Sequence, residues 1–369
     1  MDKDIEKKNV FLPAFGNKPE TIVGRRAVTA SFVDGLSCPI GHKQRTSILI
    51  GQRGAGKTAL LLEFAELAEK RGFVPARVTA NDDMLEEIIQ TIQVGGAKYV
   101  RSPKGVKGFS AGALGFSFGL TFTDETETKY GFRIKLGMLC DELEKHGKGV
   151  LILVDEVQPN TEQMRSLAAT YQHLIGDGKN IAIAMAGLPS SISGVLNDKI
   201  LTFLNRAQKI YLEPLPYGDV SVAYATEFSK QGKSIDPGSL DRAVNATRGY
   251  PYLYQLIGYY ILGYTGDKHV ITTAIVEQAV ETSKREMIES VFLTVLSSLS
   301  GKDIEFLKVM SEDRDASRIS EIAARLKVDF PYAQKYRTRL IQAGVIAPTG
   351  RGVLAFDIPY LGEYLRGEF

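Results

Sequence analysis

The chain has few of the features that mark secreted or membrane-embedded proteins. Its 369 residues include only two cysteines, Cys38 and Cys140, too few for a disulfide framework or a cysteine-based metal cluster. Its longest apolar stretches, at residues 150–154 and 181–188, are far shorter than the roughly 20 residues that span a bilayer. The charged start, Met1 to Lys8, lacks the apolar core of a signal peptide. These absences predict a globular, cytoplasmic protein.

The chain also carries little net charge, because 45 Lys and Arg residues are nearly balanced by 43 Asp and Glu residues. A charge of +2 provides no general attraction to nucleic acid, so any such contact must come from a local patch. The length suits two or three domains, and an apolar content of 44% is enough to build their cores.

One short segment carries the strongest functional signal. It fills every fixed position of the pattern G-x-x-x-x-G-K-[ST], which builds a phosphate-binding loop. An apolar run at residues 47–50 precedes it as a buried strand would, and helix-forming residues 59–65 follow it, so that a helix N-terminus faces the anion. The predicted nucleotide-binding residues of this segment are Gly51, Gln52, Arg53, Gly54, Ala55, Gly56, Lys57 and Thr58.

The residue types of this loop match the chemistry of a nucleoside triphosphate. The glycines let successive backbone N–H groups point toward the phosphates, Lys57 reaches the β- and γ-phosphate oxygens, and the Thr58 hydroxyl contacts Mg²⁺. The alternative is a glycine-rich turn with an unrelated lysine, but the preceding strand and the following helix favour the phosphate loop. We therefore predict that the protein binds ATP or GTP.

A second motif provides the acids that a nucleotide hydrolase needs. Residues 149–154 form an apolar run of the kind that is buried on both faces of a parallel sheet, and Asp155 and Glu156 follow at its carboxyl end. Asp155 is predicted to hold Mg²⁺, directly or through water, and Glu156 to polarise the attacking water. Two adjacent acids at a strand end often only contact water. Here the pair indicates a nucleotide hydrolase because a phosphate-binding loop precedes it in the chain.

The remaining pattern divides the chain into four parts. Residues 1–18 are predicted to be a flexible leader, and residues 19–215 alternate strands and helices as an α/β domain with a parallel sheet does. Within that domain a helix is expected over about 21–36, and Cys140 falls on the buried face of another near 136–143. Residues 216–300 have only helical patterns, as a small lid would, and residues 301–369 form the last domain.

Residues 95–131 interrupt the α/β alternation. The segment is rich in glycine, and residues 114–122 alternate strictly between apolar and small or polar side chains, which predicts a strand with one apolar face. We interpret the segment as a β-hairpin inserted into the α/β domain. It either packs on the sheet, which is the simpler interpretation, or contacts DNA or a partner protein.

The last domain is predicted to be a winged helix. Helices are expected over 303–310, 319–326 and 331–343, followed by a β-ribbon at 345–347 and 353–356. Lys335 and Arg339 lie on the outward face of the third helix, as in a helix that enters the major groove, and Arg351 lies at the ribbon tip, where it could enter a minor groove. The polar residues that share this outward face are Gln334, Lys335, Thr338, Arg339 and Gln342.

Lys335, Arg339 and Arg351 are therefore the predicted contacts with duplex DNA. The charge of this domain is balanced, however, with eleven Lys or Arg residues against ten Asp or Glu residues between 301 and 369. Winged helices also bind proteins, so a protein partner is the alternative.

The order of these motifs resembles the AAA+ and STAND classes of P-loop ATPases. It is most similar to bacterial and archaeal ATPases whose nucleotide domain resembles that of origin-recognition and replication-initiator proteins. The resemblance covers about residues 19–365. The motifs that carry it are Val23-Gly24-Arg25, the phosphate loop, the strand ending in Asp155-Glu156, an arginine before the last strand, and Gly249-Tyr250-Pro251 in the helical lid.

The resemblance implies roles for residues that spacing alone does not assign. Val23, Gly24 and Arg25 would line the adenine side, Pro251 would pack near the base, and Arg206 would act as a finger on the nucleotide of a neighbouring subunit in a homo-oligomer. It also favours ATP over GTP, in agreement with the lack of a guanine-selecting N-K-x-D element.

The chain departs from the AAA+ pattern at residues 187–189, Gly-Leu-Pro, which offer no polar side chain to sense the γ-phosphate. Slow, switch-like hydrolysis is therefore expected. Arg248 is either a sensor in the lid or an ordinary surface arginine. Two functions remain open: an ATPase whose nucleotide state controls a DNA-binding winged helix, and a STAND-type signalling or defence switch whose winged helix contacts protein.

Overall fold

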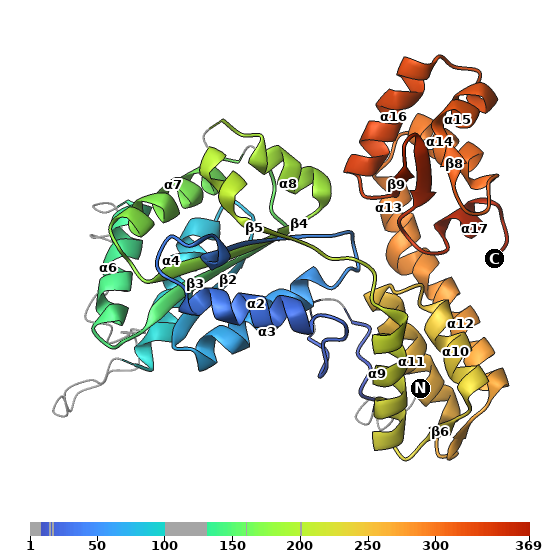
Figure 1. Cartoon of the computed structure of the whole chain (residues 1–369), viewed down its shortest axis with the longest axis horizontal. Helices are drawn as coiled ribbons and strands as arrows, with labels where there is room; N and C mark the ends of the chain where they lie inside the picture. Colours follow the sequence, from blue (N-terminus) through green and yellow to red (C-terminus); the bar gives the residue numbers. More distant parts are fainter. Residues whose placement is uncertain (1–8, 15, 17, 100–130, 160, 200) are drawn as a thin grey trace, which may run out of the picture.

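The structure is a computed structural model that describes residues 9–14, 16, 18–99, 131–159, 161–199 and 201–369. Figure 1 shows an α/β domain beside a column formed by a helical lid and a C-terminal domain. Among these residues, every helix is too short or too polar to cross a bilayer. The predicted β-hairpin at 95–131 lies almost wholly outside the described residues.

The α/β domain is built on a five-stranded parallel sheet. Its strands β1, β3 and β4 are buried along nearly their whole length, because helices cover both faces of the sheet. The strand order is β2-β3-β4-β1-β5, so β4 separates β1 from β3, and the carboxyl ends of all three meet at one edge. The strands are β1 (Thr46–Ile50), β2 (Phe73–Thr79), β3 (Gly149–Asp155), β4 (Ile181–Gly187) and β5 (Gln208–Tyr211).

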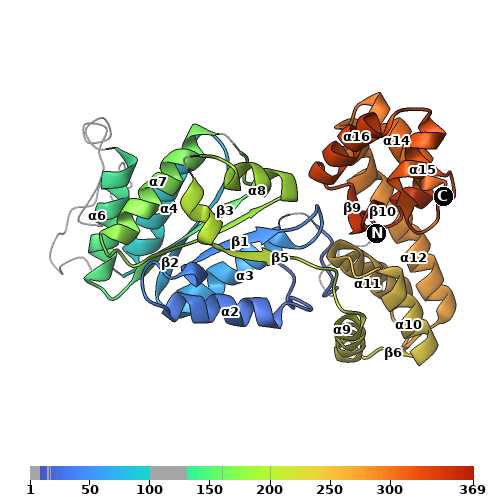
Figure 2. The same ribbon diagram turned by 45° about the horizontal axis from the view of Figure 1, so that its top comes forward.

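Helices cover both faces of this sheet (Figures 1 and 2). Helices α2 (Arg26–Ser37) and α3 (Lys57–Lys70) pack on one face, where the rings of Phe32 and Phe64 stack with centroids 3.8 Å apart. The other face has a separate core with the buried Cys140, whose pKa burial raises to about 12. It is covered by α4 (Met84–Ala97), α6 (Phe132–Glu144), α7 (Glu162–Gly176) and α8 (Pro189–Leu196); short turns η1 (Lys43–Arg45) and η2 (Thr202–Arg206) precede β1 and β5.

The structure differs from two predictions for the N-terminal region, for the first over residues 21–25 and for the second over residues 9–14. The helix expected from residue 21 begins only at Arg26, because Gly24 adopts a left-handed φ of 66° that no helix continues through. The leader expected to be flexible is packed over residues 9–14, where the Phe11 side chain is 1% exposed and lies in the core of the lid. The apolar run Val10-Phe11-Leu12 within a charged segment was a sequence signal for this packing.

The lid follows the α/β domain and is mainly helical, as predicted. One short parallel bridge, β6 (Ser234–Ile235) with β7 (Val270–Ile271), was not predicted. A π-helical turn, η3 (Ile288–Phe292), continues directly from the last long helix, and such turns are frequent at functional sites. The helices are α9 (Tyr217–Lys230), α10 (Pro237–Ala246), α11 (Pro251–Thr265), α12 (Thr273–Met287) and α13 (Leu293–Ser297).

The C-terminal domain has the element order of a winged helix, which agrees with the predicted fold class. Three helices are followed by a ribbon, and the small sheet has the antiparallel order β8-β10-β9. A capping box between Ser300 and Asp303 starts the first helix. The elements are α14 (Gly301–Ser311), β8 (Ser317–Arg318), α15 (Ile319–Leu326), α16 (Phe330–Gln342), β9 (Ile346–Gly350), β10 (Val353–Phe356) and α17 (Leu361–Leu365).

The lid and the winged helix share one continuous core of buried side chains. The rings of Phe292 and Tyr364 lie 5.4 Å apart across the boundary, and the Tyr360 hydroxyl donates a hydrogen bond to the carbonyl oxygen of Ala246 at 2.7 Å. Arg248 forms an ion pair with Glu363, and its guanidinium lies 4.0 Å from the centre of the Tyr360 ring. Arg248 therefore joins the lid to the winged helix, which neither of its two predicted roles anticipated.

Candidate functional site

The predicted phosphate loop lies between the carboxyl end of β1 and the first turn of α3. Gly54 and Gly56 have φ angles of 73° and 84°, which only glycine adopts without strain. Gly56 is the N-cap of α3, and Lys57 and Thr58 are the first residues of that helix. The backbone N–H groups of the first turn are consequently free to face an anion.

Lys57 points back over the loop. Its Nζ donates hydrogen bonds to the carbonyl oxygens of Gly51 at 2.9 Å and of Gln52 at 2.7 Å. Burial lowers the pKa of Lys57 to about 8, although the negative charge of Asp155 acts in the opposite direction. A phosphate would supply the negative charge that this half-buried ammonium group lacks as a direct partner.

ATP affinity is therefore expected to fall as the pH rises through about 8, because only protonated Lys57 attracts phosphate. The Kd should rise about tenfold for each pH unit above that value, until the lysine of the complex, whose pKa phosphate raises, also loses its proton. Calorimetric titrations between about pH 7 and pH 9.5 measure this change, and a constant Kd over that range would contradict it. Lys57→Ala is the control, because its residual binding should lack the slope.

The same lysine affects folding with the opposite sign. Its pKa is about 8 in the folded protein against a usual value of 10.5, so the unfolded chain binds more protons between these two values. The contribution of Lys57 to stability therefore rises as the pH increases through that window.

The two predicted acids lie at the same edge of the sheet as the loop. The Thr58 hydroxyl donates to Oδ2 of Asp155 at 2.6 Å, which brings together the two side chains predicted to hold Mg²⁺. Glu156 is exposed and has a φ of 52°, a left-handed conformation that is uncommon for a residue with a side chain. Such strain is often found at functional sites.

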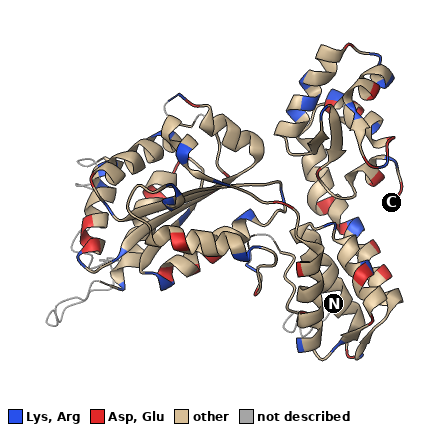
Figure 3. Ribbon diagram, viewed as in Figure 1, with Lys and Arg blue, Asp and Glu red and all other residues tan. Residues whose placement is uncertain are grey.

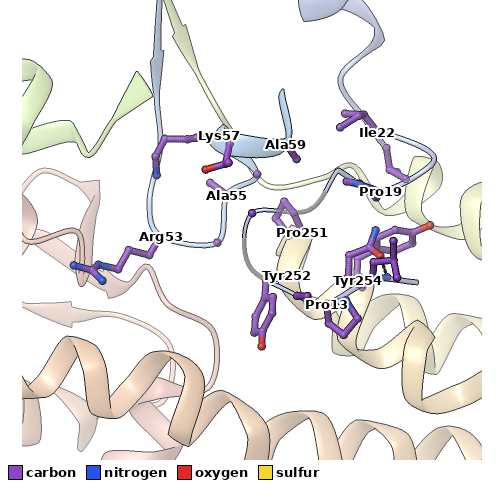
Figure 4. Close-up of a pocket in the computed structure, with 18 of the residues that line it drawn as sticks. Pro13, Pro19, Ile22, Arg53, Ala55, Lys57, Ala59, Pro251, Tyr252 and Tyr254 are labelled. Atoms are coloured by element: carbon purple, nitrogen blue, oxygen red, sulfur yellow. Dashed lines mark hydrogen bonds between the residues drawn. The ribbon is translucent and has the colours of Figure 1, made fainter. Parts of the chain in front are cut away.

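A cavity of about 360 Å³ lies over the loop, and Figure 4 shows residues that line it. Its wall combines the phosphate loop, both acids, the segment before α2, the N-terminal segment and the lid. The lining residues of the α/β domain are Pro19, Thr21, Ile22, Val23, Arg25, Arg53, Gly54, Ala55, Gly56, Lys57, Thr58, Ala59, Asp155, Glu156 and Leu215; those of the N-terminal segment and lid are Leu12, Pro13, Ala14, Gly16, Pro251, Tyr252, Tyr254, Gln255, Ser290 and Val291.

The residues that the resemblance placed at the base lie at this cavity. Val23, Arg25 and Pro251 line it, and Gly24 forms the turn between the first two. Arg25 is buried, where its guanidinium donates to the carbonyl oxygen of Glu213 at 2.7 Å, and burial lowers its pKa. Arg25 therefore also holds the end of β5 in place.

Tyr250, the central residue of the Gly249-Tyr250-Pro251 motif, is a site residue without a predicted role. Its hydroxyl donates to the carbonyl oxygen of Arg53, which places the lid directly on the phosphate loop. A Cβ atom added to Gly54 would lie only 2.2 Å from that hydroxyl oxygen. A glycine is thus needed at position 54 both for the left-handed turn of the phosphate loop and for the close approach of Tyr250 from the lid.

Gln52 does not line the cavity, although it belongs to the loop. Its side chain lies beside the winged helix, where burial raises the pKa of the Asp357 carboxyl group and Gln52 acts in the opposite direction. A Cβ atom added to Gly344 would lie 1.9 Å from Gln52 Oε1. The winged helix therefore touches the phosphate loop, a contact between distant segments that sequence patterns do not reveal.

Arg206 lies at the opposite edge of the sheet. β5 runs parallel to β1 with Gln208 beside Ser47, so Arg206 precedes the amino end of β5, whereas the phosphate loop follows the carboxyl end of β1. Its side chain is exposed. It does not line the cavity of its own chain.

The end of β4 lies between the phosphate loop and the two acids, where a γ-phosphate sensor would act. The backbone N–H of Gly51 contacts the carbonyl oxygen of Gly187 at 3.4 Å, and Leu188 precedes α8. Among the described residues, none between Glu156 and Leu215 lines the cavity. The described cavity wall therefore has no side chain from the end of β4 that could sense the γ-phosphate, in agreement with the sequence of residues 187–189.

The three predicted DNA contacts have different surroundings. Lys335 and Arg351 are exposed on α16 and on the β9–β10 turn. Arg339 instead forms an ion pair with Asp303, whose side chain is fully buried. The DNA contact of Arg339 stays a prediction, and the charge of Arg339 also balances a buried carboxylate. Figure 3 shows acidic and basic residues intermixed over this domain.

Comparisons with known proteins address the fold of the chain. A family model for a domain of unknown function (DUF8462) matches residues 289–365, which is the winged helix and the turn before it. No curated protein matches the sequence.

Solved structures similar to this one cover nearly the whole chain. The Walker-type ATPase PABY2304 of Pyrococcus abyssi has a TM-score of 0.69 at 17% identity, with 95% of this chain and 97% of that chain covered. The ORC2 protein of Aeropyrum pernix, solved with ADPNP and ADP, has a TM-score of 0.66 at 14% identity, with 99% and 96% covered. Cdc6p from Pyrobaculum aerophilum has a TM-score of 0.51 at 13% identity, with 100% of this chain and 98% of that chain covered.

These likenesses confirm the predicted fold class, a parallel sheet flanked by helices as in P-loop NTPases, and the helical C-terminal region is consistent with a winged helix. The identities are low, so the similarity concerns the fold.

Proposed function

We propose that this protein binds and hydrolyses ATP and that its nucleotide state controls the winged-helix domain. The observation that carries the proposal is the convergence of Lys57, the Thr58–Asp155 pair and Glu156 on one cavity that the lid covers. The solved structure of a similar protein with ADPNP and ADP supports a nucleotide as the ligand.

Each residue has a separate task in hydrolysis. Lys57 leaves its two carbonyl partners to neutralise the β- and γ-phosphates, and Glu156 orients a water molecule and accepts its proton as the water oxygen attacks phosphorus. The bond from the γ-phosphorus to the β–γ bridging oxygen breaks, and ADP and phosphate leave. Because β4 supplies no sensor side chain, we propose that turnover is slow.

The residues present also fit a magnesium ion. Thr58 and Asp155 offer hard oxygen donors 2.6 Å apart, and the described residues contain no group of three or more His, Cys, Asp or Glu side chains that would bind a metal without a substrate. Mg²⁺ in phosphoryl-transfer sites is typically held by one or two protein oxygens together with substrate phosphates. When bound, it would neutralise charge that develops on those phosphates.

Contacts at the loop supply a route from nucleotide to winged helix. The backbone carbonyl of Gln52 accepts a hydrogen bond from Lys57, and its side chain packs against Gly344 of the winged helix. When Lys57 moves onto a phosphate, the backbone of Gln52 loses its hydrogen bond to Lys57. The winged helix contacts the side chain of the same residue, so the change can reach that domain. Since the lid and winged helix share a core, both would respond as one unit, and α16 would shift against its neighbour α8.

The DNA part of the proposal rests on Lys335 and Arg351. Lys335→Ala/Arg351→Ala is expected to weaken duplex binding and to lower the slope of log affinity against log salt by up to about two, one per lost phosphate contact. Anisotropy titrations of a labelled duplex at several salt concentrations, with and without ATP, measure this slope. Lys302→Ala, which removes an exposed positive charge on α14 of the same domain, is the matched control. Arg339 is left intact because Asp303 needs its charge.

A protein partner is the second candidate, and the balanced charge of the winged helix and the internal use of Arg339 favour it. In that function the winged helix acts as an internal lock, as the resemblance to STAND proteins implies. If the intact protein shows no salt-sensitive affinity for duplex DNA in either nucleotide state, DNA binding is excluded and this function replaces it.

Arg206 is proposed to act on the nucleotide of a neighbouring subunit, because its own loop lies at the other sheet edge. Arg206→Ala should leave ATP affinity nearly unchanged and lower turnover, since a finger stabilises charge in the transition state. Turnover per subunit should rise with protein concentration in the wild type but not in Arg206→Ala. Lys209→Ala is the matched control. If turnover does not depend on protein concentration and Arg206→Ala does not alter it, Arg206 is an ordinary surface arginine and the proposal is wrong.

A further inference from the structure

The N-terminal segment Asn9–Ala14, called the strap below, is anchored in the lid. The Phe11 ring is 1% exposed, and its centre lies 5.7 Å from the ring centre of Tyr224 and 5.5 Å from that of Tyr254. A Cβ atom added to Gly258 of α11 would lie 2.6 Å from the Phe11 ring. The lid therefore has a socket whose floor requires glycine.

Hydrogen bonds hold the strap on both sides of Phe11. Asn9 Nδ2 donates to the carbonyl oxygen of Tyr259 at 3.0 Å, and the backbone N–H of Leu12 donates to Gln255 Oε1 at 2.9 Å. Both partners belong to α11, whose first residue is Pro251. The strap thus has a defined position relative to the helix that covers the phosphate loop.

The chain that follows the strap returns to the α/β domain. Lys18 forms ion pairs with Glu63 at 2.6 Å and Glu66 at 2.5 Å, both on α3. Helix α3 begins at the phosphate loop. The strap and Lys18 therefore link the lid to the α/β domain beside the cavity that the two share.

The strap residues that follow Phe11 line the cavity. Leu12, Pro13 and Ala14 are part of its wall, and Figure 4 shows Pro13 on the side of Tyr254 and away from Lys57. Ile22 and Val23 add further apolar surface to the same cavity. The phosphate end is defined by Lys57 and Thr58, so this apolar end suits the flat base of a nucleotide.

We propose that the strap is part of the nucleotide site, where Leu12 and Pro13 cover the base and Phe11 holds them in place. The inference rests on the proposed ATP binding and assigns the base end of that site. The strap has no Lys or Arg, so it contributes affinity for the nucleoside and none for the phosphates. Because the strap links the lid to the α/β domain, contact between the strap and the base would also favour the closed position of the lid.

The test compares two ligands, ATP and inorganic tripolyphosphate, by calorimetry in Mg²⁺-containing buffer. Leu12→Ala/Pro13→Ala is expected to bind ATP about tenfold more weakly, the effect of losing one well-packed apolar contact, and to bind tripolyphosphate as the wild type does. Phe11→Ala, which frees the whole strap, should lower ATP affinity at least as much. Thermal unfolding checks that each variant is folded.

Ile40→Ala is the matched control, because Ile40 and Leu12 are each 38% exposed and Ile40 does not line the cavity. Equal ATP affinity in the wild type and the Leu12/Pro13 variant would overturn the inference, as would an equal loss for ATP and tripolyphosphate in a folded variant. A wild-type protein that binds neither ligand would instead overturn the proposed function, and the inference with it. The Leu12/Pro13 variant keeps the test decisive if Phe11→Ala fails to fold.

Discussion

Lys57→Ala is expected to weaken ATP binding at least about 100-fold and to abolish hydrolysis. Lys57 lies at the cavity with its Nζ over the loop, whereas Figure 4 shows Arg53 directed away from it. Charge-assisted hydrogen bonds to two phosphate oxygens would be lost, and each is worth about 1.5–3 kcal/mol. Calorimetric ATP titration and phosphate release measure the two effects.

The fold of this variant should remain intact, because the half-buried Lys57 side chain has no carboxylate partner in hydrogen-bond contact. Lys70→Ala, at the exposed end of the same helix, should bind ATP as the wild type does. Full ATPase activity in Lys57→Ala would remove the central claim that this loop binds the phosphates.

Glu156→Gln is expected to bind ATP normally but to turn it over at least ~100-fold more slowly, which is the usual effect of losing a general base. The amide keeps the shape of the side chain but cannot accept the proton of the attacking water. Single-turnover hydrolysis together with a binding titration separates the two steps.

Asp155→Asn is the informative comparison, because Asp155 bonds the Thr58 hydroxyl and is proposed to hold the metal. It should weaken Mg²⁺-dependent ATP binding itself, whereas binding in Mg²⁺-free buffer should change little. Normal hydrolysis by Glu156→Gln would place the base elsewhere. Negligible hydrolysis by the wild type would make the protein a nucleotide-gated switch that does not require turnover.

Contacts between domains could not be predicted, because they join segments that are far apart in the sequence. Leu12 and Gln255 are 243 residues apart, and Tyr250 and Arg53 are 197 apart. The outward face of α16 shows the same limit. The helical spacing correctly predicted that Lys335 is exposed, but only the packing of α14 beside α16 revealed that Arg339 neutralises the buried Asp303.

The sequence by itself determined the phosphate loop, the acid pair, the strand and helix pattern of the α/β domain and the three helices of the winged helix. Each of these depends on residues close together in the chain, where hydrogen-bonding patterns and apolar periodicity act locally. Only the tertiary structure decided that Phe11 anchors in the lid, that the Gln52 side chain contacts Gly344 of the winged helix, and that lid and winged helix share a core. Those pairings follow from shape and burial between distant surfaces, which no local pattern specifies.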